Sequence, residues 1–589
     1  MRFPCLLLCL IATCFASAQV AYNSSFELQK SNGKLLNWNS YSNENRYMLS
    51  PQKTTKHSGS YALLIDGSNA GRSANEENAG IFYQPLPASL LAGKKTIRLE
   101  AWVKLDTPAY ACLLIQKLGS AGQKIYYGFP DTSKKIEGWQ HVKVEAPITN
   151  DGELYIGGLL NDKARAWFDD LVIYLDDRPL KDIAKPAPLP SASEIAWIKK
   201  RSIPLLSIEP QGQHTDLDAL YKLTGNPAII ALGEPTHGTS EVFTLRLRLL
   251  KYLVEQQGFT TLMLEDELPE AGLINDYVLY GRDTAVSLVK KLLFPVWQNE
   301  EMVALIEWMR TYNQTHDKKI QFRGMDMQSV RVARQNLLRF GRDNDPTLAG
   351  QVEELAKMTG RLSKNWESGQ RPLIKDSLVK LTENIQAHFE SRLQDYGKKA
   401  QPDTLNWMQL NLAILAQYYP NMDWEMSSDY RDSCMAQNII DYYRQYPDTK
   451  MLIWAHNSHV SRAGGMMGYW LNRYFKKRYF NIGFATSEGT YTASVDVAKT
   501  SWKAYNLEAP YAGTLEYYLQ EAGSNYILPL PGGDEENRDG AWMGKKLEMR
   551  SIGFRGQEDQ FSPVVPLEEF DALIFMKKTS HSRSYKLKK

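Results

Sequence analysis

The sequence has few cysteines, almost no net charge and no long hydrophobic run. Only 5 of its 589 residues are cysteine, and 69 Lys+Arg stand against 67 Asp+Glu, a formal net charge of +2. So few cysteines exclude a scaffold built on disulfides, which needs many of them in a short chain. The charge balance argues against a nucleic-acid-binding protein, whose domain normally carries a clear basic excess. No stretch reaches the roughly 18–20 apolar residues of a transmembrane helix, so no transmembrane segment is predicted.

Several catalytic motifs are absent as well. There is no Gly-x-Ser-x-Gly elbow, which disfavours a serine nucleophile of the α/β-hydrolase type. There is also no phosphate loop, dinucleotide fingerprint or zincin His-Glu-x-x-His. Cys112 and Cys434 have no neighbouring histidine in the sequence, so we expect isolated buried thiols. These absences favour direct attack of water on the substrate, with a histidine as general base.

The first residues have the order of a secretory signal peptide. Arg2 precedes an apolar run over Pro4–Phe15, and a small-x-small cleavage site follows at Ala16–Ala18. Residues 1–18 are therefore predicted to be removed, and the mature protein is expected to be secreted or periplasmic. A lipoprotein attached through Cys14 is the alternative, which is less favoured because a lipobox prefers Gly or Ala where Thr13 stands.

The remaining chain divides at a proline-rich stretch. Residues 19–178 show alternating, strand-like segments such as Thr96–Leu105, separated by turn residues, which predicts an all-β sandwich. Residues 179–196 are rich in proline and form the predicted linker. In 197–589 apolar strands alternate with helical patterns, which predicts an α/β domain with a parallel sheet. Residues from about 330 to 448 show almost only helical pattern and are predicted to be an α-helical insertion.

Polar residues gather where the predicted strands of the second domain end. Glu234 and His237 follow the strand at 228–232, Glu265–Glu267 follow the strand at 260–264, and Asp326 and Gln328 follow the strand at 320–324. His456 and His459 follow the strand at 451–454. Because the carboxyl ends of parallel strands lie along one edge, these four clusters are expected to meet in one crevice. That combination of histidines and carboxylates predicts an active site.

His237 is the best candidate for the general base. Glu234, three residues earlier, can orient its ring and stabilise the imidazolium. Arg246 carries a cationic fork that could stabilise a carbonyl oxyanion. A metal is the rival hypothesis, because Glu234, His237, His456 and His459 are acceptable zinc or iron ligands, although none of their spacings makes a complete site. We expect that no metal or other cofactor is required.

Read together, these clusters resemble the erythromycin esterase family. The resemblance rests on three stretches, Leu232–Glu241, Arg323–Gln328 and Trp454–His459, with weaker support from Arg431–Asn438 and Phe570–Phe575. It covers residues from about 197 to 580. It implies a mixed α/β core with a helical subdomain and a hydrolase that opens the lactone ester of macrolide antibiotics, and hence a role in antibiotic resistance.

The resemblance also implies roles for particular residues. His237 would activate water, and Glu234, Arg246, Glu265, His456 and His459 would surround the ester carbonyl. Asp326 and Gln328 are expected to contact the substrate, a small-molecule ester or lactone. A metal-dependent hydrolase of envelope polysaccharide esters is one alternative. A glycan-binding surface or periplasmic protein with a degenerate enzyme domain is another.

The first domain resembles carbohydrate-binding jelly-roll modules. The likeness rests on Asn23–Glu27, Lys56–Leu63 and Ala166–Asp170. It implies a glycan partner and a structural calcium that Glu27 and Asp169 could bind. The alternative is a spacer without a ligand, in which Trp38, Trp102, Trp139 and Trp167 belong to the sandwich core. The sequence carries no signal for the oligomeric state.

Overall fold

The computed structural model describes most of the chain. The described residues are 22–30, 32–42, 46–70, 79–86, 88–119, 122–131, 138–148, 152–180, 187–211, 214–364, 371–421, 428–496, 499–530, 540–556 and 560–587. The predicted signal peptide and residues 181–186 of the predicted linker lie outside these ranges. None of the described helices is both long enough and apolar enough to cross a membrane.

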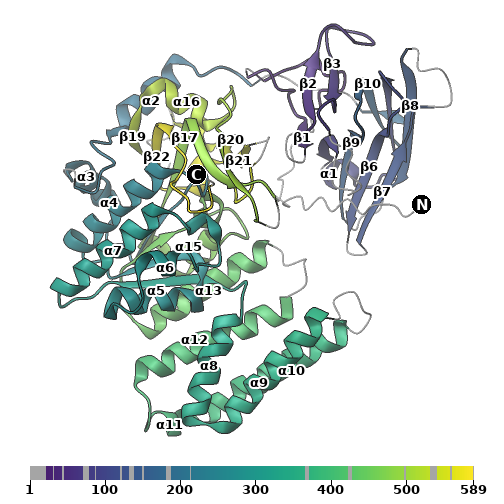
Figure 1. Cartoon of the computed structure of the whole chain (residues 1–589). Coiled ribbons are helices and arrows are strands. Elements are labelled where there is room, and N and C mark those ends of the chain that lie inside the picture. Colours follow the sequence, from purple (N-terminus) through teal and green to yellow (C-terminus); the bar gives the residue numbers. More distant parts are fainter. Residues whose placement is uncertain are drawn as a thin grey trace. The chain divides into compact units, whose positions relative to one another are not determined.

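The chain forms two compact units (Figure 1). The first comprises Met1–Pro190, Glu508–Tyr517 and Gln557–Gln560. The second comprises Ser191–Leu507, Tyr518–Gly556 and Phe561–Lys589. Two short segments far along the sequence therefore belong to the first unit, which the division at the prolines did not predict.

The first unit is a sandwich of two antiparallel sheets, as predicted. One sheet has the order β1 (Asn39–Ser42), β4 (Gly80–Leu86), β9 (Gly152–Leu160), β6 (Ala111–Gly119) and β7 (Gly122–Gly128). The other has the order β2 (Met48–Gln52), β3 (Ala62–Asp66), β10 (Arg165–Leu175), β5 (Thr96–Leu105) and β8 (Gln140–Pro147), with β11 (Arg178–Pro179) on β10 and the short helix α1 (Ala88–Leu91) after β4. Every second residue of β5 is buried, so the alternation in the sequence marks the face that packs into the core.

The four tryptophans of the sandwich differ in burial. Trp38 and Trp167 are buried. Trp102 and Trp139 are only half-buried, and the ring of Trp102 stacks on His57 with 4.1 Å between centroids. The interpretation of all four as core residues is therefore wrong for Trp102 and Trp139.

The predicted calcium ligands have other partners. The carboxylate of Glu27 accepts the backbone N–H groups of Ser60 and Tyr61. Asp169 accepts those of His57 and Ser58. Both carboxylates therefore hold one loop against the sheet. Among the described residues, no group of three or more His, Cys, Asp or Glu side chains is placed to bind a metal.

The second unit is built on a mixed sheet. Its order is β12 (Ile203–Pro204), β19 (Asn525–Pro529), β22 (Ala572–Thr579), β17 (Tyr479–Ser494), β13 (Ile229–Leu232), β16 (Met451–Trp454), β14 (Thr261–Glu267) and β15 (Gln321–Asp326), with β18 (Trp502–Asn506) on β17. The strands from β22 to β15 run parallel, whereas β19 and β12 pair antiparallel. Every residue of β13 and β16 is buried, as their continuous apolar sequences predict. A separate ribbon pairs β20 (Leu547–Arg550) with β21 (Phe561–Val564).

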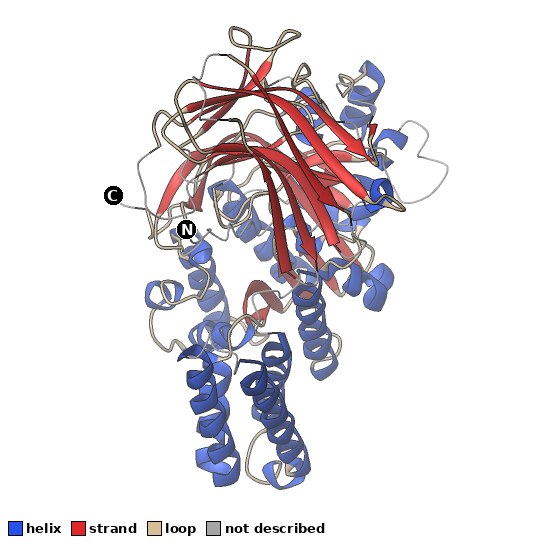
Figure 2. Cartoon of the chain, turned by 90° about the vertical axis from the view of Figure 1, so that its right-hand side faces the viewer, coloured by secondary structure: helices blue, strands red, loops and turns tan. Residues whose placement is uncertain are grey.

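Helices cover this sheet and form the insertion. Those outside the insertion are α2 (Ala192–Arg201), α3 (Thr215–Leu223), α4 (Ser240–Gln257), α5 (Leu268–Tyr280), α6 (Ala285–Val289), η2 (Pro295–Trp297), α7 (Glu300–Thr315), α14 (Asn457–Val460), α15 (Met467–Phe475), η4 (Lys476–Arg478), α16 (Leu515–Ala522), η5 (Ala541–Gly544) and α17 (Pro566–Glu569). The insertion contains α8 (Arg331–Asn344), α9 (Pro346–Lys364), α10 (Arg371–Ser391), α11 (Leu393–Tyr396), α12 (Pro402–Tyr418), η3 (Tyr419–Asn421) and α13 (Ser428–Gln445). Its described residues hold helices and no strand, as predicted (Figure 2).

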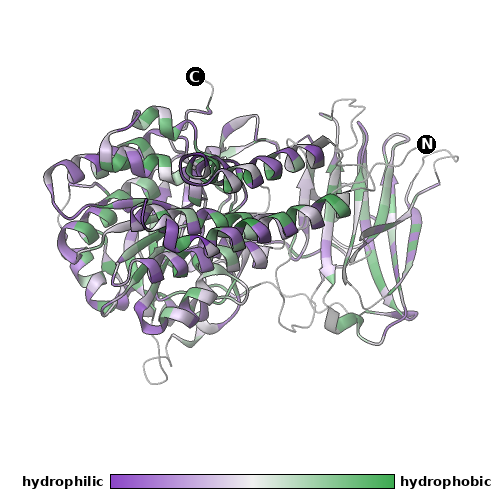
Figure 3. Cartoon of the chain, turned by 90° about the horizontal axis from the view of Figure 1, so that it is seen from below, coloured by the Kyte–Doolittle hydropathy of each residue, from purple (hydrophilic) through white to green (hydrophobic). Residues whose placement is uncertain are grey.

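Hydrophobic and hydrophilic residues alternate along the long helices (Figure 3). Helix α4 buries Val242, Leu245, Leu249 and Leu253, the residues whose spacing predicts it. Cys112 and Cys434 are both buried and free, as expected.

Candidate active site

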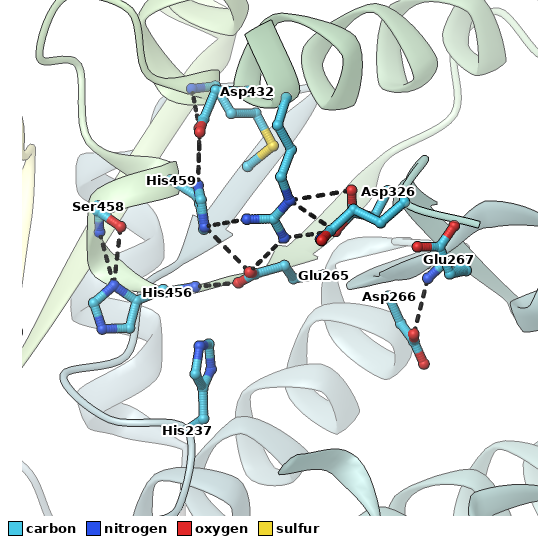
Figure 4. Close-up of polar contacts among 12 residues, drawn as sticks. His237, Glu265, Asp266, Glu267, Asp326, Asp432, His456, Ser458 and His459 are labelled. Carbon is cyan, nitrogen blue, oxygen red and sulfur yellow. Dashed lines mark hydrogen bonds and ion pairs between the residues drawn. The ribbon is translucent and has the colours of Figure 1, made fainter. Parts of the chain in front are cut away.

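The polar clusters that follow four strands meet at one edge of the sheet. β13, β16, β14 and β15 are consecutive neighbours and run parallel, so their carboxyl ends lie together. His237 follows β13, Glu265 and Asp326 belong to the ends of β14 and β15, and His456 follows β16. The predicted convergence is confirmed, and Figure 4 shows these side chains around a common centre.

Glu234 holds His237 so that one ring nitrogen stays free. Nδ1 of His237 lies 2.5 Å from Oε1 of Glu234. The Glu234 side chain is fully buried, whereas that of His237 remains 11% exposed. Because a carboxylate only accepts hydrogen bonds, Nδ1 carries the proton and Nε2 is left with a free lone pair. A histidine in this state can accept a proton from water.

Close packing fixes the turn that carries His237. Thr236 Oγ1 accepts the N–H of Gly238 at 3.0 Å, and Gly238 O accepts the N–H of Thr492 on β17 at 2.9 Å. A Cβ atom at Gly238 would lie 1.9 Å from Thr492 O, so only glycine fits this approach. The His237 ring packs edge-on against Trp297 of η2, with 5.6 Å between centroids.

Arg246 lies behind Glu234. Its side chain is fully buried, and Nη1 donates to Glu234 Oε2 at 2.7 Å, while Nη2 donates to backbone carbonyls that include Leu232 O at 3.1 Å. Trp454 Nε1 donates to the same Glu234 oxygen at 3.1 Å. Burial lowers the pKa of Arg246 to about 10, opposed by Glu234, so the group stays cationic at neutral pH. This geometry differs from the expected oxyanion contact, because Arg246 positions Glu234 instead.

A bulge in β14 turns Glu265 toward the histidines. Leu264 pairs with Gly324 and Glu267 with Asp326, so β14 has one more residue than β15 between these pairs. Such a bulge redirects side chains. A Cβ atom at Gly324 would lie 2.4 Å from Glu267 O, so glycine is needed for β15 to approach the bulge.

Glu265 is surrounded by donors. Oε2 accepts the His456 N–H at 2.9 Å, and Oε1 lies 3.1 Å from His459 Nε2 and 2.9 Å from Arg431 Nη2. Burial would raise the pKa of Glu265, but His459, Arg431 and His237 lower it well below its ordinary value. Glu265 therefore stays ionised and holds His459 and Arg431, not Arg246.

His459 is a cation between two carboxylates. Its Nδ1 lies 2.9 and 3.0 Å from the two carboxylate oxygens of Asp432 on α13, and its Nε2 faces Glu265. Burial would lower the pKa of His459, but Asp432 and Glu265 raise it to about 10. Arg431 Nη1 also lies 3.1 Å from Nε2 of His459. Both ring nitrogens of His459 are therefore occupied by protein groups, and neither is open to a proton from water.

His456 is neutral and presents an unpaired donor. Its Nδ1 lies 3.0 Å from Ser458 Oγ and accepts the Ser458 N–H at 3.4 Å, which puts the proton on Nε2. Burial and the nearby His237 lower the pKa of His456 to about 3. Nε2 is buried and makes no hydrogen bond of good geometry among the described residues, although the backbone of Pro235 lies close enough to favour the charged ring slightly. The ring lies 5.2 Å from that of His237. An unpaired donor beside a candidate base is suited to an oxyanion.

Asp326 and Gln328 hold the side chain of Arg431 in place. Asp326 is fully buried and accepts the Arg431 Nε at 3.0 Å and Nη2 at 2.5 Å. Gln328 Nε2 donates to Asp326 Oδ2 at 2.9 Å. Burial lowers the pKa of Arg431, but Asp326 and Glu265 outweigh it and raise the pKa. Asp326 and Gln328 therefore position Arg431, which differs from the substrate contact expected of them.

Three further buried carboxylic acids lie beside this cluster. Asp266, Glu267 and Glu270 each have one carboxylate oxygen without a partner among the described residues. Burial, followed by the neighbouring acids, raises the pKa of Asp266 and Glu267 well above their ordinary values. Burial therefore disfavours the charged form of Asp266 and Glu267.

The sequence model of the erythromycin esterase family matches residues 254–579, more than half of the 589 residues. The chain belongs to the erythromycin esterase family. YbfO of Bacillus subtilis (strain 168) is 23% identical over 429 residues, 65% of this chain and 92% of that protein. Erythromycin esterase type II of Escherichia coli is 22% identical over 363 residues, 56% of this chain and 86% of that protein. The crystal structure of a Bacillus cereus protein aligns at 25% identity with a TM-score of 0.60, over 68% of this chain and 100% of that chain.

Membership of the erythromycin esterase family supports hydrolase chemistry at this sheet edge. The matched stretch contains Glu265, Arg431, Asp432, His456 and His459, whereas Glu234 and His237 precede it. The structure brings both sets together, because β13 lies between β17 and β16.

Sequence reasoning missed Arg431 and Asp432 as members of the site. Both begin a stretch that supported the family resemblance, but they lie on a helix of the insertion, far from the four strand ends in sequence. One signal could have found them, because the predicted crevice contained many carboxylates and few cations to pair with them.

The rival metal site does not fit the geometry of this erythromycin esterase family member. Glu234 gives both oxygens to His237, Arg246 and Trp454, and His459 gives both nitrogens to carboxylates. No three of the described His, Cys, Asp and Glu side chains converge as metal ligands. Glu234 and His459 thus have no ligand atom to spare, and the free nitrogens of His237 and His456 alone do not make a metal site.

Proposed function

We propose that the protein is an exported carboxylic-ester hydrolase that opens a macrolide lactone or a related ester by attack of water. The observation that carries this proposal is a pair of free ring nitrogens, of opposite hydrogen-bonding character, on two neighbouring histidines. His237 Nε2 is a free acceptor because Glu234 holds Nδ1, and His456 Nε2–H is an unpaired donor. The two rings are 5.2 Å apart between centroids.

In the first step His237 Nε2 takes a proton from water as the oxygen attacks the ester carbonyl. The imidazolium is stabilised by Glu234, which is itself held by Arg246 and Trp454. The His456 Nε2–H donates to the carbonyl oxygen as it becomes negative. A neutral donor is well suited to this role, because it does not compete with His237 for the water proton.

In the second step the tetrahedral intermediate expels the alkoxide. The imidazolium of His237 returns its proton to that oxygen, which leaves an acid, an alcohol and the original histidine. One proton of the water molecule is thus transferred to the alcohol, and the remaining OH group becomes part of the acid. The cationic groups His459 and Arg431 stay charged throughout, so they set the field of the site without moving a proton.

The test is direct incubation with candidate esters. Purified mature protein is mixed with macrolides and with simple acyl esters, and products are examined by mass spectrometry. Addition of one water to any of them, lost in a variant without the His237 ring, supports the proposal. No product from any ester or lactone contradicts it.

Export is tested separately. The chain expressed with residues 1–18 is fractionated into cytoplasm, periplasm and medium, and the N-terminus of the mature protein is sequenced. An N-terminus at Gln19 in an exported fraction supports a signal peptide. Retention of the full chain in the cytoplasm contradicts it.

A further inference from the structure

The negatively and positively charged side chains of the site differ in their exposure to solvent. The carboxylates of Glu234, Asp326 and Asp432 are fully buried, and Glu265 is 7% exposed. Arg431 is 19% exposed and His459 12%. The cations of the site are therefore more exposed to solvent than its carboxylates.

Lys499 adds a further cation at this edge. Its Nζ lies 5.1 Å from the ring centroid of Phe294 and 4.5 Å from that of Phe554. Phe294 leads into η2, whose Trp297 packs on His237 and donates to Glu265 O at 2.9 Å. Lys499 thus contacts the residue that precedes η2, and η2 in turn contacts the candidate base His237.

The Lys499 ammonium has no counter-charge in contact. Across the part of the chain that the structure describes, it makes no hydrogen bond and no ion pair, and its contacts are the two aromatic rings. Burial and the nearby Arg431 lower the pKa of Lys499, while Asp326 and Asp266 oppose this shift. Two cations thus lie within electrostatic range of each other and of buried acids that Lys499 does not touch.

The backbone at Lys499 is unusual. Its φ is 58°, in the left-handed region that residues other than Gly, Asn and Asp seldom adopt. The loop is held by Asp496, which accepts the N–H groups of Thr500 and Ser501 at 3.0 Å, and by Trp502, whose Nε1 donates to Lys499 O at 3.0 Å. A long cationic side chain is therefore held in a conformation that would suit Gly or Asn better, which points to a role for its charge.

We propose that the substrate is an ester that also carries a carboxylate near the scissile bond, and that Lys499 binds this carboxylate. The inference rests on the proposed ester hydrolysis and names the substrate class of the same site. An ammonium among aromatic rings and without a counter-charge gains most from an incoming anion, because little water separates the two charges. Lys499 here selects the substrate and takes no part in the proton transfers.

Matched pairs of esters test the proposal. Monomethyl glutarate and methyl pentanoate share one methyl ester and differ only in a terminal carboxylate on the acyl part. 3-Acetoxypropanoate and propyl acetate differ in the same way on the alcohol part. We expect the wild-type protein to show about tenfold or greater kcat/KM for the charged member of one pair, since charge-assisted contacts contribute on this scale. The pair that shows the preference tells which side of the ester carries the carboxylate.

Variants connect the preference to Lys499. Lys499→Asn suits the left-handed backbone and removes the charge, so the preference should fall about tenfold, mainly through KM. Lys499→Arg keeps the charge and should keep most of the preference. Lys503→Met is the matched control, because Lys503 is exposed on β18 and its ammonium lies over Tyr505.

The outcomes separate this inference from the proposed function. Equal turnover of both members in both pairs, or a preference unchanged in Lys499→Asn, overturns the inference and leaves ester hydrolysis standing. Absence of turnover for every ester and lactone overturns the proposed function, and the inference falls with it. A preference that Lys499→Asn removes and Lys503→Met retains supports both.

Discussion

Two histidine–carboxylate pairs lie in the site, and they have opposite properties. Glu234 holds Nδ1 of His237 at 2.5 Å, and Asp432 holds Nδ1 of His459 at 2.9 Å. The two pairs differ in what surrounds the second ring nitrogen, Nε2. Nε2 of His459 faces Glu265 at 3.1 Å, whereas Nε2 of His237 makes no hydrogen bond among the described residues.

This comparison teaches that a carboxylate on one ring nitrogen does not by itself make a base. His459 has a second carboxylate on the other nitrogen and is fixed as a cation, with its pKa raised to about 10 against the pull of burial. His237 keeps a lone pair that can accept a proton. A histidine beside a carboxylate therefore gives a base after β13 and a cation beside α13.

The largest expected effect comes from exchanging each histidine for asparagine. Asn has a side-chain N–H close to the position of Nδ1 and lacks Nε2. We expect His237→Asn to lower kcat by about 10⁴-fold or more, because the base is lost while Glu234 keeps a donor. His459→Asn should also lower kcat, but by a factor at least ten times smaller. Equal losses in steady-state kinetics on any hydrolysed ester would contradict the comparison.

Glu234→Gln is expected to have the next largest effect. The amide leaves the shape of the site nearly unchanged but cannot stabilise the imidazolium, so kcat should fall by about 10²- to 10⁴-fold with a small change in KM. Glu307→Gln is a suitable control, because Glu307 accepts the Tyr277 hydroxyl away from the site. A variant with wild-type kcat would show that Glu234 does not act through His237.

Asp432→Asn tests the second pair through stability. Breaking this buried ion pair leaves His459 with only one of its two carboxylates, Glu265, and should lower the free energy of unfolding by about 3 kcal/mol. Asp441→Asn is the matched control on the same helix, because its partner Arg444 is 57% exposed and such pairs contribute less than about 1 kcal/mol. Urea denaturation measures both, and equal losses would mean that Asp432–His459 behaves as a surface pair.

The pH dependence of stability gives the smallest effect and a definite sign. His459 has its pKa raised from 6.5 to about 10, so its contribution is complete below 6.5 and is lost as the pH rises toward 10. His456 has its pKa lowered from 6.5 to about 3, so its contribution is complete above 6.5 and is lost as the pH falls toward 3. Unfolding measured across this range, with NMR of the ring protons, checks both. A His459 ring that titrates near pH 6.5 would contradict the assignment.

Much of the fold could be predicted because it depends on local pattern. The alternation along β5 and the continuous apolar residues of β13 and β16 predict strands with one and two buried faces. The helix α4 follows from its apolar spacing. The antiparallel strands β19 and β12 were not predicted, because short edge strands carry too few residues to show a period.

The membership of the site was predictable only in part. A parallel sheet must bring its strand ends together, so the meeting of His237, Glu265 and His456 follows from sequence order and topology. The roles of Arg246 and Asp326 did not follow, because burial depends on packing from other elements. Arg431 was missed for the same reason, since α13 reaches the sheet edge only in the folded chain.

The sequence by itself determined which residue types stand at the strand ends, and hence that histidines and carboxylates would meet. It determined this because strand periodicity and parallel order are properties of short segments. Only the tertiary structure decided which histidine keeps a free nitrogen, which acids are ionised and that Lys499 touches no counter-charge among the described residues. These depend on burial and on distances of about 3 Å between groups far apart in sequence, where small displacements decide whether a hydrogen bond or a charge exists.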